Sequence, residues 1–176
     1  MTMKPQNFNQ NDASILLVGF MGSGKTTVGQ ALAIHLNFAF FDLDRLIEAR
    51  AGRSVAQIFG ELGESEFRRL EQEAILGCRD VRRAVIALGG GAYESKENRN
   101  ALRAIGRTVW LDCPLDVCLR RISGDQSRPL LADEAQMSAL LEQRRSAYEL
   151  ADYVVQTGEL SAGQLAVEIA KMCRTH

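Results

Sequence analysis

Residues 19–26 read GFMGSGKT, which fits the P-loop pattern of glycine, four variable residues and then Gly-Lys-Ser/Thr. The preceding residues 13–18 form an apolar run of strand length, and a helical pattern of apolar residues begins after Lys25. Strand, glycine-rich loop and helix are the setting that this motif requires. The chain is therefore predicted to fold around a loop that holds nucleotide phosphates.

The residue types of the loop suit an anion. Gly19, Gly22 and Gly24 tolerate positive φ angles and let backbone N–H groups approach phosphate oxygens closely. The following helix adds unpaired N–H groups and the positive end of its dipole. Lys25 brings a full charge near the β- and γ-phosphates, and the Thr26 hydroxyl is suited to ligate Mg²⁺. The alternative, a glycine-rich turn without a ligand, is disfavoured by the complete spacing of the motif.

Length and composition fit one globular domain. At 176 residues, with 46% hydrophobic and 24% charged residues, the chain can bury a core of ordinary size. A net charge of −1 gives no electrostatic basis for nucleic acid or an anionic membrane as the main partner. Residues 1–13 lack the apolar core of a signal peptide and are predicted to be a flexible tail. We expect a cytoplasmic monomer with a single domain over residues 14–176.

The cysteines do not indicate a metal site. Cys78, Cys113, Cys118 and Cys173 include no C-x-x-C pair, and the chain has only 2 histidines. Cys113 and Cys118 lie in or beside an apolar segment and are expected to be small buried side chains in a reducing compartment.

Apolar segments of strand length alternate with helical patterns along the chain. The predicted strands are 13–18, 38–41, 84–88, 108–111 and 153–155. This alternation predicts a three-layer, doubly wound α/β fold with a parallel five-stranded sheet and right-handed crossovers. Ligands of such sheets bind beyond the carboxyl ends of the strands. The P-loop, the carboxylates at 42 and 44 and the glycines at 89–91 all follow strands, so we expect them to share one crevice.

Helical patterns fill most of the remaining sequence. Helices are predicted over 25–37 and 45–51, from Gly63 to about 79, over 95–105, after Pro114, over 136–150 and from Ser161 onward. Ser54 is predicted to cap a short turn that runs through Phe59. The polar segment at about 124–135 contains Pro129 and is predicted to be a lid.

Asp42 and Asp44 lie two residues apart at the end of a predicted strand, where an extended chain points them to opposite sides. One carboxylate can hold Mg²⁺ directly or through water, while the other takes the proton of an acceptor hydroxyl. The alternative is helix capping, with Asp44 capping a helix that begins at Arg45. A position opposite a P-loop favours phosphoryl transfer.

Three consecutive glycines, Gly89, Gly90 and Gly91, follow the third predicted strand. Each glycine loses much backbone entropy on folding, which favours the close approach of a ligand or another backbone as their explanation. A sharp turn is the alternative.

Four arginines stand out by their context rather than by their type: Arg68, Arg121, Arg128 and Arg144. Arg68 and Arg144 lie on predicted helices, Arg121 precedes the lid and Arg128 lies within it. Taken singly, each is more simply interpreted as a solvated surface residue.

Six motifs together carry a family resemblance: GFMGSGKTTVG, FFDLDRLIE, GESEFRRLE, ALGGGA, RPLL and an arginine four residues before Tyr148. Their order and spacing over about residues 14–156 resemble the shikimate kinase family. The resemblance implies a P-loop fold of the nucleoside monophosphate kinase type, with a substrate-binding region at about 42–80 and a mobile lid at about 124–135. It also implies phosphorylation of the shikimate 3-hydroxyl by MgATP, in aromatic amino acid biosynthesis.

The resemblance implies a role for each matching residue on the nucleotide side. The ATP phosphates would be bound by Gly22, Ser23, Gly24, Lys25, Thr26 and Thr27. Mg²⁺ would be held by Thr26 and supported by Asp42. Arg121 would stack on adenine, and Arg128 would reach the phosphates from the lid.

On the acceptor side, the resemblance implies that Arg68 and Arg144 clamp the shikimate carboxylate, with backbone contacts from Gly90 and Gly91. Asp44 would contact the shikimate hydroxyls and is the candidate base. Asp44 would act with two cations already named on the nucleotide side, Lys25 and Arg128, in catalysis.

Two positions depart from the family pattern. Leu43 stands where a small polar residue is usual, and Ser146-Ala147 replace the Pro-Leu expected before Tyr148. The first could alter how Asp42 is held, and the second could shift Arg144.

Two rival functions remain open at the level of sequence. A related kinase could act on gluconate or on an aminated shikimate analogue, because an arginine clamp selects a carboxylate without fixing the ring. A nucleotide switch that hydrolyses GTP would require an Asn-Lys-x-Asp motif, which the chain does not contain.

Overall fold

A computed structural model of the chain describes residues 13–123, 134–158 and 160–174. Residues 1–12 of the predicted tail at 1–13 and most of the predicted lid, including Arg128, lie outside the described residues. The described strands form one parallel sheet in the order β2-β3-β1-β4-β5. Their bounds are β1 (Ser14–Val18), β2 (Ala39–Asp42), β3 (Ala84–Ala87), β4 (Gly106–Asp112) and β5 (Tyr153–Gln156).

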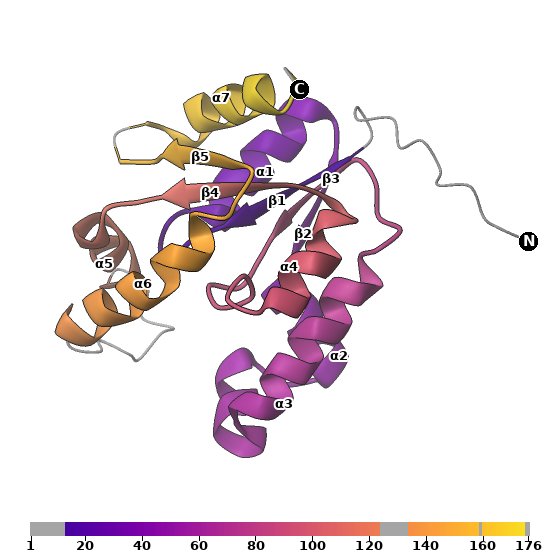
Figure 1. Ribbon diagram of the computed structural model, residues 1–176, viewed down its shortest axis with the longest axis vertical. Helices are drawn as coiled ribbons and strands as arrows, with labels where there is room; N and C mark the ends of the chain where they lie inside the picture. The colour runs from indigo at the N-terminus through magenta and orange to yellow at the C-terminus, as the bar shows by residue number, and fades with distance from the viewer. Residues whose placement is uncertain (1–12, 124–133, 159, 175–176) are drawn as a thin grey trace, which may run out of the picture.

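Helices cover both faces of the sheet and make the three layers that the sequence predicts (Figure 1). One face is covered by α1 (Lys25–Leu36) and α7 (Ala162–Arg174). The other packs against the remaining helices: α2 (Leu43–Ala51), α3 (Val55–Gly77), α4 (Lys96–Arg103), α5 (Leu115–Ser123) and α6 (Glu134–Tyr148).

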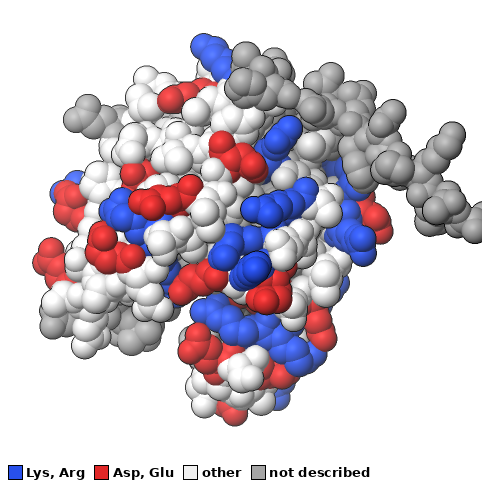
Figure 2. Space-filling view, viewed as in Figure 1, with Lys and Arg blue, Asp and Glu red and all other residues white. Residues whose placement is uncertain are grey.

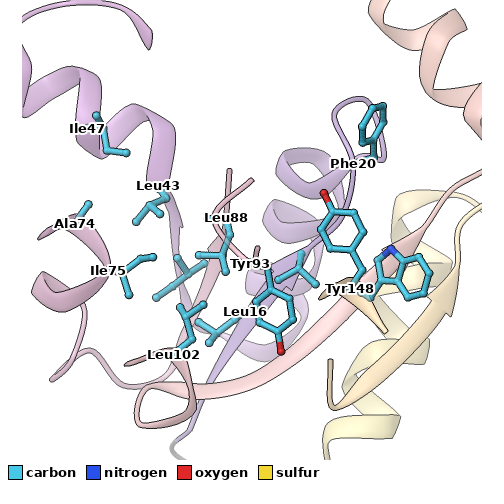
Figure 3. Packing of buried hydrophobic residues seen from close by; sticks show 14 of the residues in the cluster. Leu16, Phe20, Leu43, Ile47, Ala74, Ile75, Leu88, Tyr93, Leu102 and Tyr148 are labelled. Atoms are coloured by element: carbon cyan, nitrogen blue, oxygen red, sulfur yellow. The ribbon is translucent and has the colours of Figure 1, made fainter. Parts of the chain in front are cut away.

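The central strand β1 shows why the sheet is buried on both sides. Ile15 and Leu17 pack in the cluster under α1 and α7, whereas Leu16 and Val18 pack in the opposite cluster. Alternate residues of a strand point to opposite faces, so an uninterrupted apolar run is required at this position. Figure 3 shows the second cluster, to which β1 contributes Leu16, α2 Leu43, α3 Ile75 and α4 Leu102.

Helix α2 begins at Leu43, two residues earlier than the sequence predicts. Its N-cap is Asp42, which has an extended conformation and accepts a hydrogen bond from Arg45 N at 3.4 Å. The alternative, in which Asp44 caps this helix, is therefore wrong, because Asp44 already lies in its first turn. Leu43 is fully buried, so the departure from the family pattern at this position is a core residue.

Helix α3 joins two segments that the sequence predicts separately. Ser54 caps the helix, as predicted, and forms a reciprocal capping box with Gln57. The helix continues past Phe59 and is interrupted only at Gly63, whose φ of 83° is not helical. Gly63 thus marks a kink within one long element.

The strand order positions the candidate site. The chain leaves β1 toward β2 on one side and reaches β4 on the other side later, so β1 lies between β3 and β4. A crevice forms at such a switch point, beyond the carboxyl ends of the strands. None of the helices in the described ranges is both long and apolar enough to span a membrane.

Candidate active site

The P-loop has the backbone that its glycines predict. Gly19, Gly22 and Gly24 have φ angles of 144°, 75° and 97°, which disfavour any residue with a side chain. Space is also limited, because a Cβ on Gly22 would lie 2.6 Å from Cys118 O. Gly24 occupies the N-cap of α1 without a side-chain cap, which leaves the N–H groups of the first turn available to an anion.

Polar side chains of the loop turn inward. Lys25 Nζ donates to Gly19 O at 2.8 Å and to Phe20 O at 2.9 Å, so the ammonium group lies over the loop. Ser23 is 1% exposed, and its Oγ has no hydrogen-bond partner among the described residues. Buried polar groups are normally satisfied, so this hydroxyl is suited to bind a ligand oxygen. Thr27, the last predicted phosphate ligand, is exposed on α1.

Thr26 and Asp42 are brought together from α1 and β2. Thr26 Oγ1 donates to Asp42 Oδ2 at 2.9 Å, beside the positive end of α1. A hydroxyl and a carboxylate are the hard oxygen donors that Mg²⁺ prefers, so the pair fits this ion. Asp42 also caps α2, so the same residue can cap a helix and contribute a carboxylate oxygen to the Mg²⁺ site.

Each of the three glycines after β3 lies against a different charged side chain. A Cβ on Gly89 would lie 2.8 Å from Asp44 Oδ1, and one on Gly90 would lie 3.2 Å from Arg144 Nη1. A Cβ on Gly91 would lie 2.6 Å from Arg68 Nη2. Ala92 N donates to Gly89 O at 3.1 Å, so the glycines form a turn as well. The turn is therefore confirmed. The close approach is made by side chains rather than by another backbone, and it brings Asp44, Arg68 and Arg144 to one place.

Arg68 is held on α3 by two glutamates. Its Nη1 donates to Glu71 Oε2 at 3.0 Å, and its Nη2 donates to Glu64 Oε1 at 3.2 Å. Burial lowers the pKa of Arg68, but Glu71 and Glu64 outweigh it and leave the pKa raised, so the guanidinium stays charged.

Glu71 is a site residue that sequence reasoning missed. It is 1% exposed, and burial raises its pKa above the usual range although Arg68 opposes the shift. The nearby charge of Asp44 contributes to the same rise. The signal was available: Glu71 shares a helical face with Phe67, Ala74 and Ile75, which are all buried. An acid on the apolar stripe of a helix indicates a buried partner.

Arg144 is the most buried of the arginines in the described site, at 9% exposure. Its Nε donates to Glu94 Oε1 at 2.7 Å. Tyr148, one turn further along α6, donates its hydroxyl proton to Gly90 O. Burial raises the pKa of Tyr148, so the phenol remains a donor at neutral pH. Helix α6 runs unbroken through Ser146 and Ala147, which keeps Arg144 beside Gly90.

Arg121 approaches the P-loop from α5. Its Nη1 donates to Gly22 O at 3.3 Å and lies 3.7 Å from Cys113 Sγ. Cys113 and Cys118 are buried, as predicted. On the face of the molecule shown in Figure 2, Lys and Arg side chains are interspersed with Asp and Glu side chains.

The described residues thus bring together a P-loop at a central parallel strand, a threonine and aspartate pair beside it, and two arginines over a glycine turn. This combination of fold and groups defines a P-loop kinase of the type that acts on small molecules. The chain belongs to the shikimate kinase family, whose sequence model, described as "Shikimate kinase", matches residues 21–174.

Individual relatives agree with this assignment. A shikimate kinase of Geobacter sulfurreducens is 43% identical over 93% of this chain and 92% of its own length. The structure of a shikimate kinase from Acinetobacter baumannii in complex with shikimate has a TM-score of 0.87 at 36% identity, covering 93% of each chain. The structure of a shikimate kinase from Aquifex aeolicus has a TM-score of 0.81 at 36% identity, over 92% of this chain and 96% of that one. The family and the fold predicted from the sequence are confirmed, and the chain is an ATP-dependent kinase.

Proposed function

We propose that this protein transfers the γ-phosphate of ATP to the 3-hydroxyl of shikimate, giving 3-phosphoshikimate and ADP in aromatic amino acid biosynthesis. Family membership supports the reaction. The observation that carries the acceptor assignment is the pair of guanidinium groups, Arg68 and Arg144, over the adjacent glycines Gly91 and Gly90. Two cations beside a glycine turn and within reach of the P-loop suit a small carboxylated acceptor.

The acceptor carboxylate is bound by Arg68 and Arg144 in this proposal, with backbone contacts from Gly90 and Gly91. Hydrogen bonds to charged groups are worth roughly 1.5–3 kcal/mol each, so two such contacts discriminate strongly against an uncharged analogue. Arg144 is nearly buried, which limits the competition of water for its donors. Asp44, against Gly89, is close enough to this clamp to meet a ring hydroxyl.

Asp44 acts as the base that takes the acceptor proton while the phosphoryl group moves. Its place in the first turn of α2 sets its carboxylate at the positive end of a helix dipole. The base must be ionised to accept a proton, and a helix N-terminus in general favours a negative charge. Glu71 lies next to it and pairs with Arg68, so the cation offsets the repulsion between the two acids.

The donor ATP is held by the P-loop residues Gly22 to Thr27, with Arg121 on the adenine. Lys25 places its charge at the β- and γ-phosphates, and Arg128 reaches them from the lid in an assignment that follows the family resemblance. Thr26 and Asp42 would hold Mg²⁺, which supplies charge neutralisation on the phosphates when it is bound. Closure of a lid at about 124–135 over a substrate-binding region at about 42–80 would exclude water as a competing acceptor. We propose a cytoplasmic monomer.

A coupled assay of ADP release tests the proposal. The panel comprises shikimate, aminoshikimate, quinate, gluconate and nucleoside monophosphates, each with MgATP. The expected result is that kcat/KM for shikimate exceeds that of every other acceptor. A higher value for gluconate or aminoshikimate would replace the proposed acceptor, and ADP release that needs no acceptor would point to a nucleotide switch.

The Mg²⁺ assignment predicts the behaviour of Asp42→Asn. Loss of the carboxylate charge beside Thr26 is expected to raise the Mg²⁺ concentration for half-maximal activity by roughly tenfold or more. Titration of Mg²⁺ at saturating ATP and shikimate measures this value. Asp116→Asn, which alters an exposed pair with Arg120, is the control and should match the wild type. Full activity in excess EDTA would rule out the ion.

Gly91→Ala tests the close approach of Arg68. The new methyl group would lie 2.6 Å and 2.8 Å from the two Nη atoms, so the guanidinium must move. We expect the KM for shikimate to rise roughly ten- to hundredfold, with the KM for ATP little changed. Gly60→Ala is a matched control, because a Cβ at that position meets nothing within 4 Å. An unchanged shikimate KM in Gly91→Ala would show that Arg68 does not bind the acceptor.

A further inference from the structure

The ion pair between Glu94 and Arg144 has no role in the reaction as described so far. Arg144 Nε and Glu94 Oε1 are 2.7 Å apart and join α6 to the segment after the glycine turn, 50 residues away in the chain. Their side chains are 11% and 28% exposed, so the pair is largely shielded from water. Figure 1 shows the C-terminal end of α6, which carries Arg144, beside the loop between β3 and α4.

A guanidinium group is planar and its N–H donors point in fixed directions, so the atom that Glu94 binds decides which donors remain for a ligand. Glu94 binds at Nε, while Nη1 of the same group lies over Gly90. The carboxylate of Glu94 therefore sets the rotation of the plane and directs its Nη end toward the glycine turn. The partners of Arg68 differ, because Glu64 and Glu71 together contact Nε and both Nη atoms of that residue.

The backbone of Glu94 is hydrogen-bonded to the glycine turn at residues 89–91. Its backbone N donates to Gly91 O at 3.1 Å, and Tyr148 on the other side donates to Gly90 O. The two backbone carbonyls of the glycine turn thus anchor both the residue that orients Arg144 and the helix that carries it. Such a closed arrangement holds the guanidinium in place before any ligand arrives.

We propose that Glu94 is a positioning residue for the acceptor: it holds Arg144 by Nε so that the Nη end is preorganised for the substrate carboxylate. This inference rests on the proposed function, since it assumes that Arg144 binds that carboxylate. Charge alone would give the opposite effect, because Glu94 repels an incoming anion and competes for the same cation. The fixed geometry favours orientation as the larger effect, since ordering a long arginine side chain is a main cost of binding.

The test is the steady-state kinetics of Glu94→Ala and Glu94→Gln in the full chain. Glu94→Ala is expected to raise the KM for shikimate about tenfold and to leave kcat and the KM for ATP within about twofold. Glu94→Gln keeps an oxygen acceptor for Nε and should restore the KM to within about twofold of the wild type. Glu142→Ala, which removes an exposed partner of the adjacent Arg145, is the matched control and should change neither KM.

The outcomes separate this inference from the proposed function. A wild-type protein that does not phosphorylate shikimate contradicts the function itself. An active enzyme in which Glu94→Ala leaves the shikimate KM unchanged, or lowers it, overturns the positioning role alone. The Nε–H resonance of Arg144 in the ligand-free protein provides a readout without turnover. The exchange of this proton with water should be faster in Glu94→Ala than in the wild type and unchanged in Glu142→Ala. Equal exchange rates in the wild type and both variants would also overturn the inference.

Discussion

Asp44→Asn is expected to lower kcat for shikimate by about 10²–10⁴-fold, the usual contribution of a general base. The amide has nearly the same shape as the carboxylate but cannot accept the hydroxyl proton. Asp44 lies on the acceptor side against Gly89 rather than at the P-loop, so the dissociation constant of ATP should stay within a few fold. Steady-state turnover at saturating shikimate and MgATP measures kcat, and a separate ATP binding titration measures the dissociation constant.

Two comparisons make this result specific. Asp80→Asn changes an exposed aspartate in the turn before β3 and should behave as the wild type. An Asp44→Asn enzyme that retains its turnover would show that another group accepts the proton. A parallel loss of ATP affinity would instead indicate that the substitution disturbs α2 and, through Asp42, the nucleotide side.

Arg68→Ala is expected to raise the KM for shikimate by roughly a hundredfold, since one charge-assisted hydrogen bond pair to the carboxylate is lost. The KM for ATP should change by less than about threefold. Arg69→Ala is the matched control, because Arg69 is 52% exposed and pairs only with Glu66 and Glu73 among the described residues. Equal effects on both substrates would assign Arg68 a structural role.

Removing Arg68 also has a stability consequence that must be separated from binding. Glu71 is buried, and Arg68 is the main group that lowers its pKa against the effect of burial, with a smaller contribution from Arg144. In Arg68→Ala the pKa of Glu71 should rise further above the ordinary value of 4.5. An acid with a raised pKa binds its proton more tightly in the folded state, so the melting temperature should fall as pH rises through that pKa. The double variant with Glu71→Gln should lose this pH dependence while keeping the high shikimate KM.

The parts of the fold that the sequence predicts are those set by local patterns. The apolar run of β1, the glycines of the P-loop and the cap at Ser54 each carry their own signal, and all three are present. The predicted start of α2 was wrong by two residues, because Asp42 and Asp44 are equally good capping residues. Only the packing of Leu43 in the core decides between them.

The candidate site residues could be predicted from the sequence where they belong to a recognisable motif. They could not be predicted where an interaction joins two segments that are far apart in the chain. Thr26 and Asp42 belong to recognisable motifs that each follow a strand, and the structure brings their side chains into a hydrogen bond. Glu71 carries a helical signal that is visible once its buried neighbours are considered. Glu94 carries none, because its partner Arg144 lies on another element and the sequence shows only a charge in a loop.

The most direct test of the account is the chemical identity of the product, followed by ³¹P NMR during incubation of the protein with MgATP and shikimate. The account predicts that the γ-phosphate signal is replaced by ADP and one phosphate monoester, coupled to the proton on carbon 3 of the ring. Release of ADP with inorganic phosphate, or a monoester at another hydroxyl, would contradict it.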